Sequence, residues 1–281
     1  MAPNLRKLTR APKFIYKLLD SHVFRSQART TTWMLLGGCL HLLLSTLLTP
    51  RLSAFLFLIL LGGRLLKNHL IATKHLRNPE LDAAIPHRFA ASFQDRDASG
   101  AVIGASRNVT VLILGAKSSH PLGVFAPGVK ELGAFMGEMM RDLNTRSAEL
   151  GYLGGTNFTG APNSGDENAQ VGIIGYFKDM ESLHAFAHSE VHRKGWGWWN
   201  KNGKQYPHLG IYHEAYDVPA HSWEAIYIQM APTGLSACTV PGKEGVSMDM
   251  VTDARKWGRT SAQRMGRTDS AAVKTDMLYS E

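Results

Sequence analysis

Cysteine is scarce in this chain of 281 residues, which has only Cys39 and Cys238, and no spacing of metal-ligand type surrounds either of them. A disulfide-stapled scaffold and a zinc site built on cysteines are therefore not expected. The chain also lacks a Rossmann fingerprint, a phosphate-binding P-loop and a haem-thiolate cysteine motif. Apolar residues nevertheless make up 44% of the sequence, which excludes a disordered chain and allows a sizeable core.

Acidic residues are almost missing from the first 30 positions, where Asp20 stands against seven Lys and Arg residues. This segment carries most of the net charge of +8, so the remainder of the chain is close to neutral. A basic arm beside an apolar run favours anionic lipid head groups over nucleic acid, or it acts only as a topology signal.

Charged side chains are missing between residues 30 and 50, a stretch that suits a membrane-spanning helix of about 20 apolar residues. A second apolar run, at 52–63, reaches a full crossing only if it includes Arg64 and Lys67. Two topologies stay open: a helical hairpin that turns at Pro50, or one span followed by an interfacial segment. A buried soluble hairpin is the remaining alternative.

The basic flanks on both sides of the apolar segment favour the hairpin under the positive-inside rule. The following domain then faces the cytosol, and we expect the membrane to be that of the endoplasmic reticulum. Two glycosylation sequons, at Asn108 and Asn157, discriminate between the topologies. They stay bare with the hairpin, and they face the lumen with a single span and a cytosolic N-terminus.

Strand and helix patterns alternate after residue 107. Strands are expected at 108–116, 151–160, 169–178, 209–218 and 223–230, and helices at 127–143 and from the N-cap Asp179 to about Arg193. This order, with one extra strand, predicts an α+β protomer of the ferredoxin-like, split βαβ type. One face of its antiparallel sheet needs a cover, and a second copy of the sheet predicts a homodimer.

These patterns divide the chain into five parts. They are a basic arm (1–29), a membrane anchor of one or two helices (30–72), a connector with short ordered pieces (73–106), the ferredoxin-like domain (107–240) and a polar C-terminal segment expected as a surface helix or mobile tail (241–281).

The stretches HSEVHRKGWGWW, GIYHEAY and WEAIYIQM, in that order, resemble the fungal, membrane-associated branch of the antibiotic-biosynthesis-monooxygenase-like family, the group represented in the fumagillin pathway. The resemblance covers about residues 80–240. It implies a dimeric α+β barrel and a monooxygenase that oxidises a lipophilic terpenoid or polyketide-type intermediate of secondary metabolism, with O₂ as co-substrate. It also implies the location of the site, a cavity between sheet and helices, but no catalytic residue.

Three histidines, His184, His188 and His192, recur at four-residue spacing and form one stripe if the helix is continuous. His188 and His192 lie closest to a tryptophan cluster and are candidate catalytic acid/base groups, with His184 a candidate substrate contact. Alternatively, these imidazoles lie at the solvent boundary and cap polar groups.

Trp196 and Trp199 are candidate substrate contacts because, together with Trp198, they supply a large flat apolar area. The cluster can line a lipophilic pocket, form the dimer contact or touch the membrane surface. Gly195 and Gly197 predict that the helix ends before the tryptophans.

His213 and Glu214 are further catalytic candidates, but adjacent residues of a regular strand face opposite sides. Tyr216, which shares a face with Glu214, and Tyr227 on the extra strand are candidate substrate contacts. A buried carboxylate needs a partner, so Glu214 or Glu224 beside a histidine is a candidate acid/base pair.

No cofactor is predicted. A histidine pair with a third ligand from His213 or Glu214 suits a metal, and one histidine suits haem, but HSEVH lacks the HExxH arrangement and no spacing identifies an axial ligand. The simplest mechanism is a base that deprotonates an activated substrate, whose carbanion then reduces O₂. The alternatives are a cyclase, isomerase or dehydratase that uses the same pocket, and a non-catalytic partner that holds substrate for another oxygenase.

Overall fold

The structure is a computed structural model that describes residues 22–26, 28–160, 168–241 and 247–267. The N-terminal elements are α2 (His22–Arg25), α3 (Thr30–Leu47), α4 (Pro50–Ala72), the 3-10 helix η1 (Pro79–Leu81) and β1 (Phe89–Ala91). The central elements are β2 (Val109–Ser118), η2 (Gly123–Phe125), α5 (Val129–Thr145), α6 (Ser147–Leu150), β3 (Tyr152–Gly160), β4 (Gln170–Phe177), α7 (Met180–Ala187), α8 (Glu190–Asn202), η3 (Gly203–Gln205) and β5 (Leu209–Val218). The C-terminal elements are β6 (Ile226–Tyr227), η4 (Gly234–Ala237), β7 (Thr239–Pro241), β8 (Ser247–Asp249), β9 (Val251–Asp253) and α9 (Ser261–Arg264).

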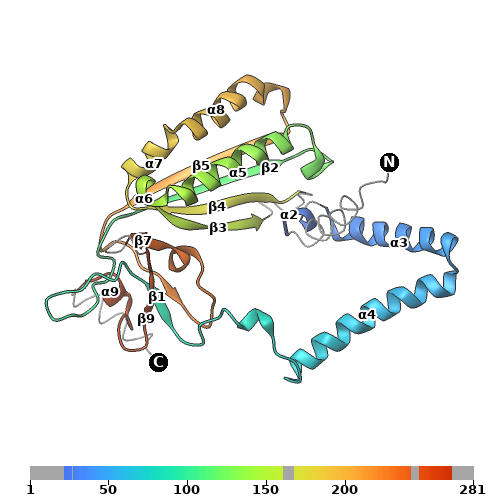
Figure 1. Ribbon diagram of the computed structural model, residues 1–281, viewed down its shortest axis with the longest axis horizontal. Helices are drawn as coiled ribbons and strands as arrows, with labels where there is room; N and C mark the ends of the chain where they lie inside the picture. Colours follow the sequence, from blue (N-terminus) through green and yellow to red (C-terminus); the bar gives the residue numbers. More distant parts are fainter. Residues whose placement is uncertain (1–21, 27, 161–167, 242–246, 268–281) are drawn as a thin grey trace, which may run out of the picture.

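A four-stranded antiparallel sheet in the order β3-β4-β2-β5 forms the centre of the molecule. Its strands follow one another along the chain as β2, α5, β3, β4, α7–α8 and β5, which is the split βαβ arrangement. The predicted ferredoxin-like protomer is therefore confirmed. Figure 1 shows α5, α7 and α8 on one face of this sheet, and we refer to the opposite face as the open face. The dimer and the barrel stay predictions.

An apolar core joins the helices to the sheet. It is built from the buried side chains of Leu143, Leu150, Tyr152, Phe177, Leu183 and Phe186, with Leu112 of β2 packed against them. Full burial of one such side chain contributes about 1.5–3 kcal/mol. The core explains why α5 shows a sharp apolar face in the sequence, since that face covers the sheet.

The helix that the sequence predicts from Asp179 to Arg193 is in fact two helices. Asp179 caps α7 as expected, because its Oδ1 accepts the Ser182 N–H at 2.7 Å. The Ser189 side chain then caps α8 by accepting the His192 N–H at 3.3 Å, so a side-chain cap starts a new helix where periodicity alone predicts continuation.

The predicted end of this helix before the tryptophans is also wrong, because α8 continues to Asn202. Gly195 is buried between α8 and α5, where an added Cβ would stand 3.3 Å from Cε of Met139. This glycine therefore serves close helix packing and does not terminate the helix.

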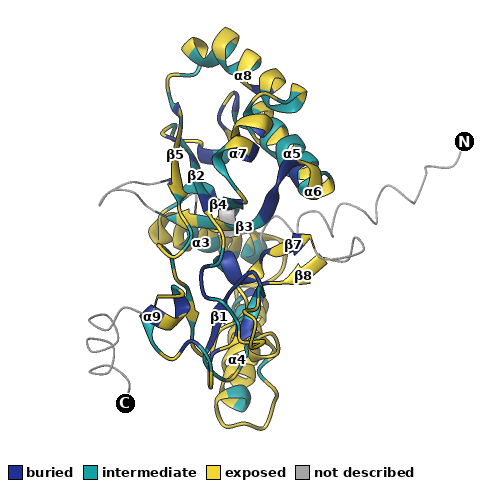
Figure 2. Cartoon of the chain, turned by 90° about the vertical axis from the view of Figure 1, so that its left-hand side faces the viewer, coloured by how far each residue is buried: buried dark blue, intermediate teal, exposed yellow. Residues whose placement is uncertain are grey.

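A second sheet, in the order β6-β1-β9, lies beside the first and corrects two expectations. The extra strand predicted at 223–230 shortens to Ile226–Tyr227 and pairs with β1, which lies in the expected connector. Over residues 247–264, the expectation of a surface helix or mobile tail is wrong, because β9 pairs with β1 and Met250 is fully buried. Figure 2 shows buried residues gathered around β1. Residues 268–281 lie outside the described part of the chain.

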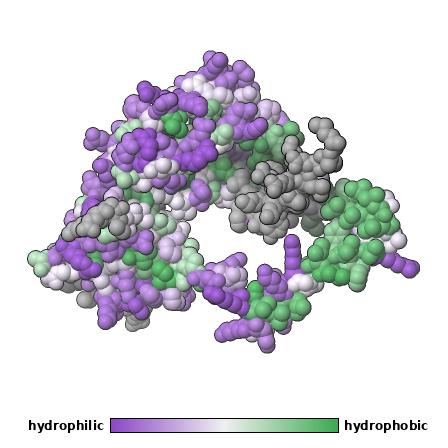
Figure 3. Space-filling model, in the orientation of Figure 1, coloured by the Kyte–Doolittle hydropathy of each residue, from purple (hydrophilic) through white to green (hydrophobic). Residues whose placement is uncertain are grey.

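The apolar N-terminal segment forms two helices, α3 and α4, each long and apolar enough to cross a membrane. In each helix, none of the residues in the most apolar 18-residue stretch is buried. Thr49 caps α4 by accepting the Leu52 N–H, and Pro50 occupies its first turn. Across the hairpin, His41 Nδ1 lies 2.8 Å from Ser53 Oγ. Figure 3 shows the continuous hydrophobic surface of α3 and the first half of α4. Residues 1–21 of the basic arm lie outside the described residues.

Candidate functional site

The three histidines predicted as one stripe do not share an environment. His184 and His188 are exposed, and His188 lies at the end of α7, where its Nδ1 is 2.8 Å from the His184 carbonyl oxygen. The break between α7 and α8 then turns His192 in a different direction, so the expected seam of imidazoles is not formed.

His192 is the half-buried member of the set. Its ring packs against Phe186 with centroids 5.6 Å apart. Burial lowers the pKa of this imidazole below its ordinary value of 6.5, and the nearby His213 and His188 lower it further. His192 is therefore neutral at pH 7 and can accept a proton.

His213 and Glu214 lie on opposite faces of β5, as the strand period requires. His213 pairs with Leu114 and faces the helices, whereas Glu214 pairs with Ile113 and lies on the open face. The Tyr216 hydroxyl donates to Glu214 Oε2 at 2.6 Å, and this bond raises the pKa of the phenol. The structure thus pairs Glu214 with Tyr216 and separates it from the histidines.

The tryptophan cluster is divided as well. Trp196 is 52% exposed, and Trp199 is half-buried against Gly203 at the end of α8. The third member, Trp198, is the one that packs tightly, stacked on Tyr206 at 6.0 Å and tilted against Phe135 at 5.6 Å. The contact with Phe135 joins α8 to α5, so the half-buried Trp198 serves helix packing.

A pocket of about 230 Å³ lies on the open face, where the central sheet meets the second sheet. Val109, Val111 and Val218 form part of its apolar wall, and Tyr176, Glu224 and Tyr227 supply polar atoms. The family resemblance implies a cavity between sheet and helices, and this pocket is on the other side of the sheet. Of the residues that the sequence analysis singled out, the pocket contains Tyr227 and Glu224.

Two phenols converge at this pocket. Tyr227 stacks on Phe89 with centroids 4.9 Å apart, and its oxygen accepts the Ser236 N–H at 3.3 Å. Gly234, with φ of +55°, lies close to both hydroxyl groups. A Cβ added to it would lie 3.3 Å from the Tyr176 oxygen and 3.6 Å from the Tyr227 oxygen. Burial raises the pKa of Tyr176 to about 12, so this phenol stays protonated at neutral pH.

Glu224 lines the same pocket and is held from the C-terminal segment. Arg264, only 8% exposed, donates from Nε to Glu224 Oε2, and the Ser261 hydroxyl donates to Oε1 at 2.8 Å. The candidate acid/base pair of Glu224 with a histidine is therefore replaced by an ion pair with arginine.

Sequence reasoning missed Tyr176 and Arg264 as site residues. A signal for the second was present, because Thr260 and Gln263 form a capping box that starts α9. Within the described ranges, no three His, Cys, Asp or Glu side chains gather in a way that could hold a metal ion. The expectation of no resident cofactor stays a prediction.

Comparison with known proteins gives a family and a loose structural likeness. A family model described as monooxygenase af470-like matches residues 109–235. The chain is 28% identical over 232 residues to monooxygenase af470 of Aspergillus fumigatus, an alignment that covers 83% of each chain.

Two solved structures are similar over parts of the chain. SnoaB, a cofactor-independent oxygenase from Streptomyces nogalater, is 11% identical over 38% of this chain and 90% of its own, with a TM-score of 0.26. An aldoxime dehydratase is 19% identical over 63% of this chain and 42% of its own, with a TM-score of 0.33. These scores are too low to support an argument about function, and the fold is assigned from the sheet order.

Proposed function

The chain belongs to the monooxygenase af470-like family, and from this premise we propose that it is a membrane-anchored monooxygenase that oxidises a lipophilic intermediate of the terpenoid or polyketide type in a fungal secondary-metabolite pathway. The domain faces the cytosol from the membrane of the endoplasmic reticulum. The family supports oxygenation, and the two apolar helices support the anchor.

The observation that carries the substrate class is the chemistry of the pocket. Its valine wall suits an apolar skeleton, while Tyr176 and Tyr227 bring two hydroxyl groups to the same end. Because the Tyr227 oxygen accepts a backbone N–H, its own O–H remains available as a donor. Two such donors fit one carbonyl oxygen, so the substrate is an apolar molecule with a ketone group.

The reaction then needs no external reductant. A base removes a proton from the methylene beside the carbonyl, and the two hydroxyls stabilise the enolate oxygen. The carbanion carbon bonds to O₂, the resulting peroxide takes up a proton, and loss of water breaks its O–O bond. The balanced result converts one CH₂ and one O₂ into C=O and H₂O.

Two groups compete for the role of the base. Glu224 lines the pocket, although its two oxygens are held by Arg264 and Ser261. His192 is neutral and half-buried, but it lies on the helix side of the sheet. We assign the role to Glu224 because it shares the pocket with the phenols.

Oxygen uptake tests the function. The purified full-length protein in detergent is mixed with anthrone, an apolar ketone with an acidic methylene, in the presence of a metal chelator. We expect equimolar O₂ consumption and anthraquinone formation, strong loss in Tyr176→Phe, Tyr227→Phe and Glu224→Gln, and near-normal activity in His192→Asn. Full activity in the first three variants refutes the pocket assignment, and loss only in His192→Asn moves the site to the helix side.

A second candidate function follows from the same groups, because phenols beside a carboxylate also suit proton transfer without oxygen. Product formation under nitrogen identifies a cyclase, isomerase or dehydratase. Tight substrate binding without turnover identifies a partner that holds substrate for another oxygenase. A Soret band in the purified protein identifies haem.

The open face also supports the proposed homodimer. The ring of Tyr212 lies over Gly115, and the ring of Phe158 lies over Gly172, so close that a Cβ at either glycine would clash. The two flat rings make a platform on which a second sheet can lie. Cross-linking and native mass spectrometry test the dimer, which a strictly monomeric protein contradicts.

A further inference from the structure

Exposed apolar side chains gather at the two places where the folded domain meets the α3–α4 hairpin. Leu122 and Phe125, in the loop between β2 and α5, are 58% and 66% exposed, and we call them the loop patch. Leu81, Ile228 and Met230 are 64%, 64% and 49% exposed, and we call them the strand patch.

The loop patch lies where the chain enters the first apolar helix. The ring of Phe24, on α2, contacts Phe125 at 5.8 Å and Trp33 at 5.2 Å between centroids. Trp33 belongs to the first turn of α3, and its indole N–H donates to the Arg25 carbonyl oxygen at 3.0 Å. A tryptophan at the start of a membrane helix is typical of the membrane–water interface. Phe125 therefore lies at the level of that interface.

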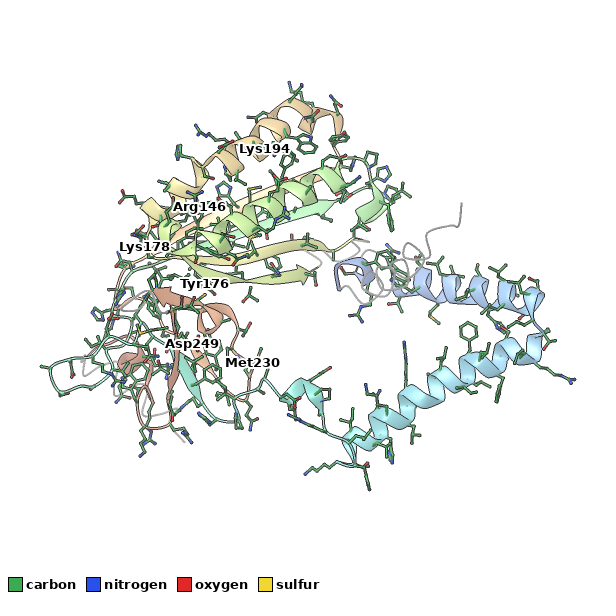
Figure 4. All side chains as sticks on the ribbon, viewed as in Figure 1. Arg146, Tyr176, Lys178, Lys194, Met230 and Asp249 are labelled. Carbon is green, nitrogen blue, oxygen red and sulfur yellow. The ribbon has the colours of Figure 1, made fainter. Side chains whose placement is uncertain are left out.

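The strand patch lies where the chain leaves the second apolar helix. After α4 ends at Ala72, η1 carries Leu81, and the Ile85 N–H then donates to the Met230 carbonyl oxygen at 3.0 Å. This bridge holds Met230 and the neighbouring Ile228 beside the segment that emerges from α4. Figure 4 shows Met230 on the side of the second sheet that faces η1 and α4.

Exposed basic residues occur in the segments next to the loop patch. Arg25 and Arg29 are exposed on the approach to α3. Lys204 is exposed on η3, two residues before Tyr206. The ring of Tyr206 packs against Gly128 at the end of the loop, within 3.0 Å of where a Cβ on that glycine would lie. Exposed apolar side chains with Lys and Arg in neighbouring segments are typical of a surface that rests on anionic lipid.

We infer that the side of the domain that carries the loop patch and the strand patch rests on a phospholipid bilayer, with Leu122, Phe125 and Ile228 inserted at the boundary between head groups and acyl chains. The inference rests on the membrane anchor of the proposed function, because a hairpin in the membrane brings both patches to the same surface. A soluble protein partner is less favoured, since the two patches flank the two ends of one apolar hairpin.

The orientation has a consequence for the substrate. β2 runs from Val109, which lines the pocket, to Ser118, which begins the loop that carries the loop patch. Between them, the open face presents Ile113 and its neighbour across the ladder, Ile174. A lipophilic molecule that leaves the bilayer at the loop patch thus meets Ile113 and Ile174 on its way along the sheet to the phenols of the pocket, with the hydrogen-bonded pair of Glu214 and Tyr216 beside them on β5.

Site-specific fluorescence tests the contact with lipid. In a Cys39→Ser background, single cysteines introduced by Phe125→Cys and Ile228→Cys are labelled with an NBD probe, while the native Cys238 stays buried. Lys178→Cys is the matched control, because Lys178 is exposed at the other end of the central sheet, at the end of β4. The full-length proteins are reconstituted in phosphatidylcholine vesicles with and without phosphatidylserine, and with lipids that carry a doxyl quencher.

We expect blue-shifted emission and at least twofold quenching by doxyl lipid at positions 125 and 228, none at position 178, and deeper quenching at 125 when phosphatidylserine is present. A label on the native Cys39, inside the hairpin, reports the anchor separately. If Cys39 is quenched but positions 125 and 228 remain in water, the inference is wrong and the anchor stands. If Cys39 is not quenched, the anchor itself fails.

A second outcome also overturns the inference. The probe at position 125 could be shielded from water, escape quenching by lipid and become exposed on dilution. That result means that a second copy of the chain covers the patch. As a functional readout, Leu122→Gln with Phe125→Gln is expected to lower turnover of vesicle-dissolved substrate severalfold and to leave turnover in detergent unchanged. Equal loss in both media contradicts a role in lipid contact.

Discussion

The ion pair between Arg264 and Glu224 ties the C-terminal segment to the pocket, and its removal gives a sharp test of this architecture. The Arg264 side chain is 9% exposed and that of Glu224 is 34% exposed. Arg264 also donates from Nη1 to the Gly258 carbonyl oxygen at 2.9 Å. Arg264→Met therefore leaves the Gly258 carbonyl oxygen without this donor and the Glu224 carboxylate with the Ser261 hydroxyl but no counter-charge.

Breaking a fully buried pair from one side costs about 3–5 kcal/mol, and water that still reaches Glu224 reduces this cost to about 2–3 kcal/mol. For domains of this size the loss corresponds to a fall in Tm of about 4–12 °C. Because the stranded charge causes most of the loss, the double variant Glu224→Gln with Arg264→Met is expected to recover about 1–2 kcal/mol relative to the single variant.

Thermal unfolding of the detergent-solubilised protein, followed by near-UV circular dichroism, measures these differences. Arg255→Met is the matched control, because Arg255 pairs with Asp253 in the same segment but the two side chains are 60% and 50% exposed. That variant is expected to change stability by less than about 1 kcal/mol. A stability of Arg264→Met equal to that of Arg255→Met, or additive effects in the double variant, would refute the reasoning.

Three further predictions concern other parts of the molecule. The pKa of His192 is lower in the folded protein than the ordinary 6.5, so the unfolded chain binds more protons and the free energy of unfolding falls as pH drops below about 6.5. We expect chemical denaturation to show a smaller fall in His192→Asn than in the unaltered protein. An equal fall would contradict the assignment. Gly195→Val places a branched side chain against Met139 and is expected to destabilise the fold by about 1–3 kcal/mol. Gly197→Ala in the same helix meets open space and is expected to stabilise the fold by up to about 1 kcal/mol. Thermal unfolding compares the two variants, and equal effects would exclude the close packing of α5 on α8. Under the proposed orientation, in which the domain faces the cytosol, the exposed sequons at Asn108 and Asn157 are expected to stay unglycosylated in a fungal host. A shift of the gel band after endoglycosidase treatment would place the domain in the lumen.

The strands and helices of the central domain could be predicted because each is a local pattern with a strong period. The alternation in the sequence of β5 indicates a strand, and the apolar face of α5 indicates a helix, because each pattern repeats with the period of its element. The same holds for α3, which has no charged residue, and for α4, whose long apolar run is interrupted by few charged residues. Order along the chain then restricted the central sheet to the ferredoxin-like topology.

The second sheet could not be predicted, because its strands are too short to show a period. β1 and β9 have three residues each and come from segments about 160 positions apart, so only their pairing makes either one a strand. The break at Ser189 was also hidden, since the four-residue spacing of the histidines continued across it.

By itself, the sequence predicted the two apolar helices, the class of fold and the resemblance to a family, because these depend on composition, local period and motif order. Only the tertiary structure decided which polar groups meet. Tyr176, Glu224 and Tyr227 share a pocket because two sheets abut there, and Arg264 reaches it from the C-terminal segment. The helix cap at Ser189 separated the histidines at four-residue spacing. The pleat of β5 placed the adjacent residues His213 and Glu214 on opposite faces. Such convergence depends on long-range contacts, and no spacing along the chain encodes it.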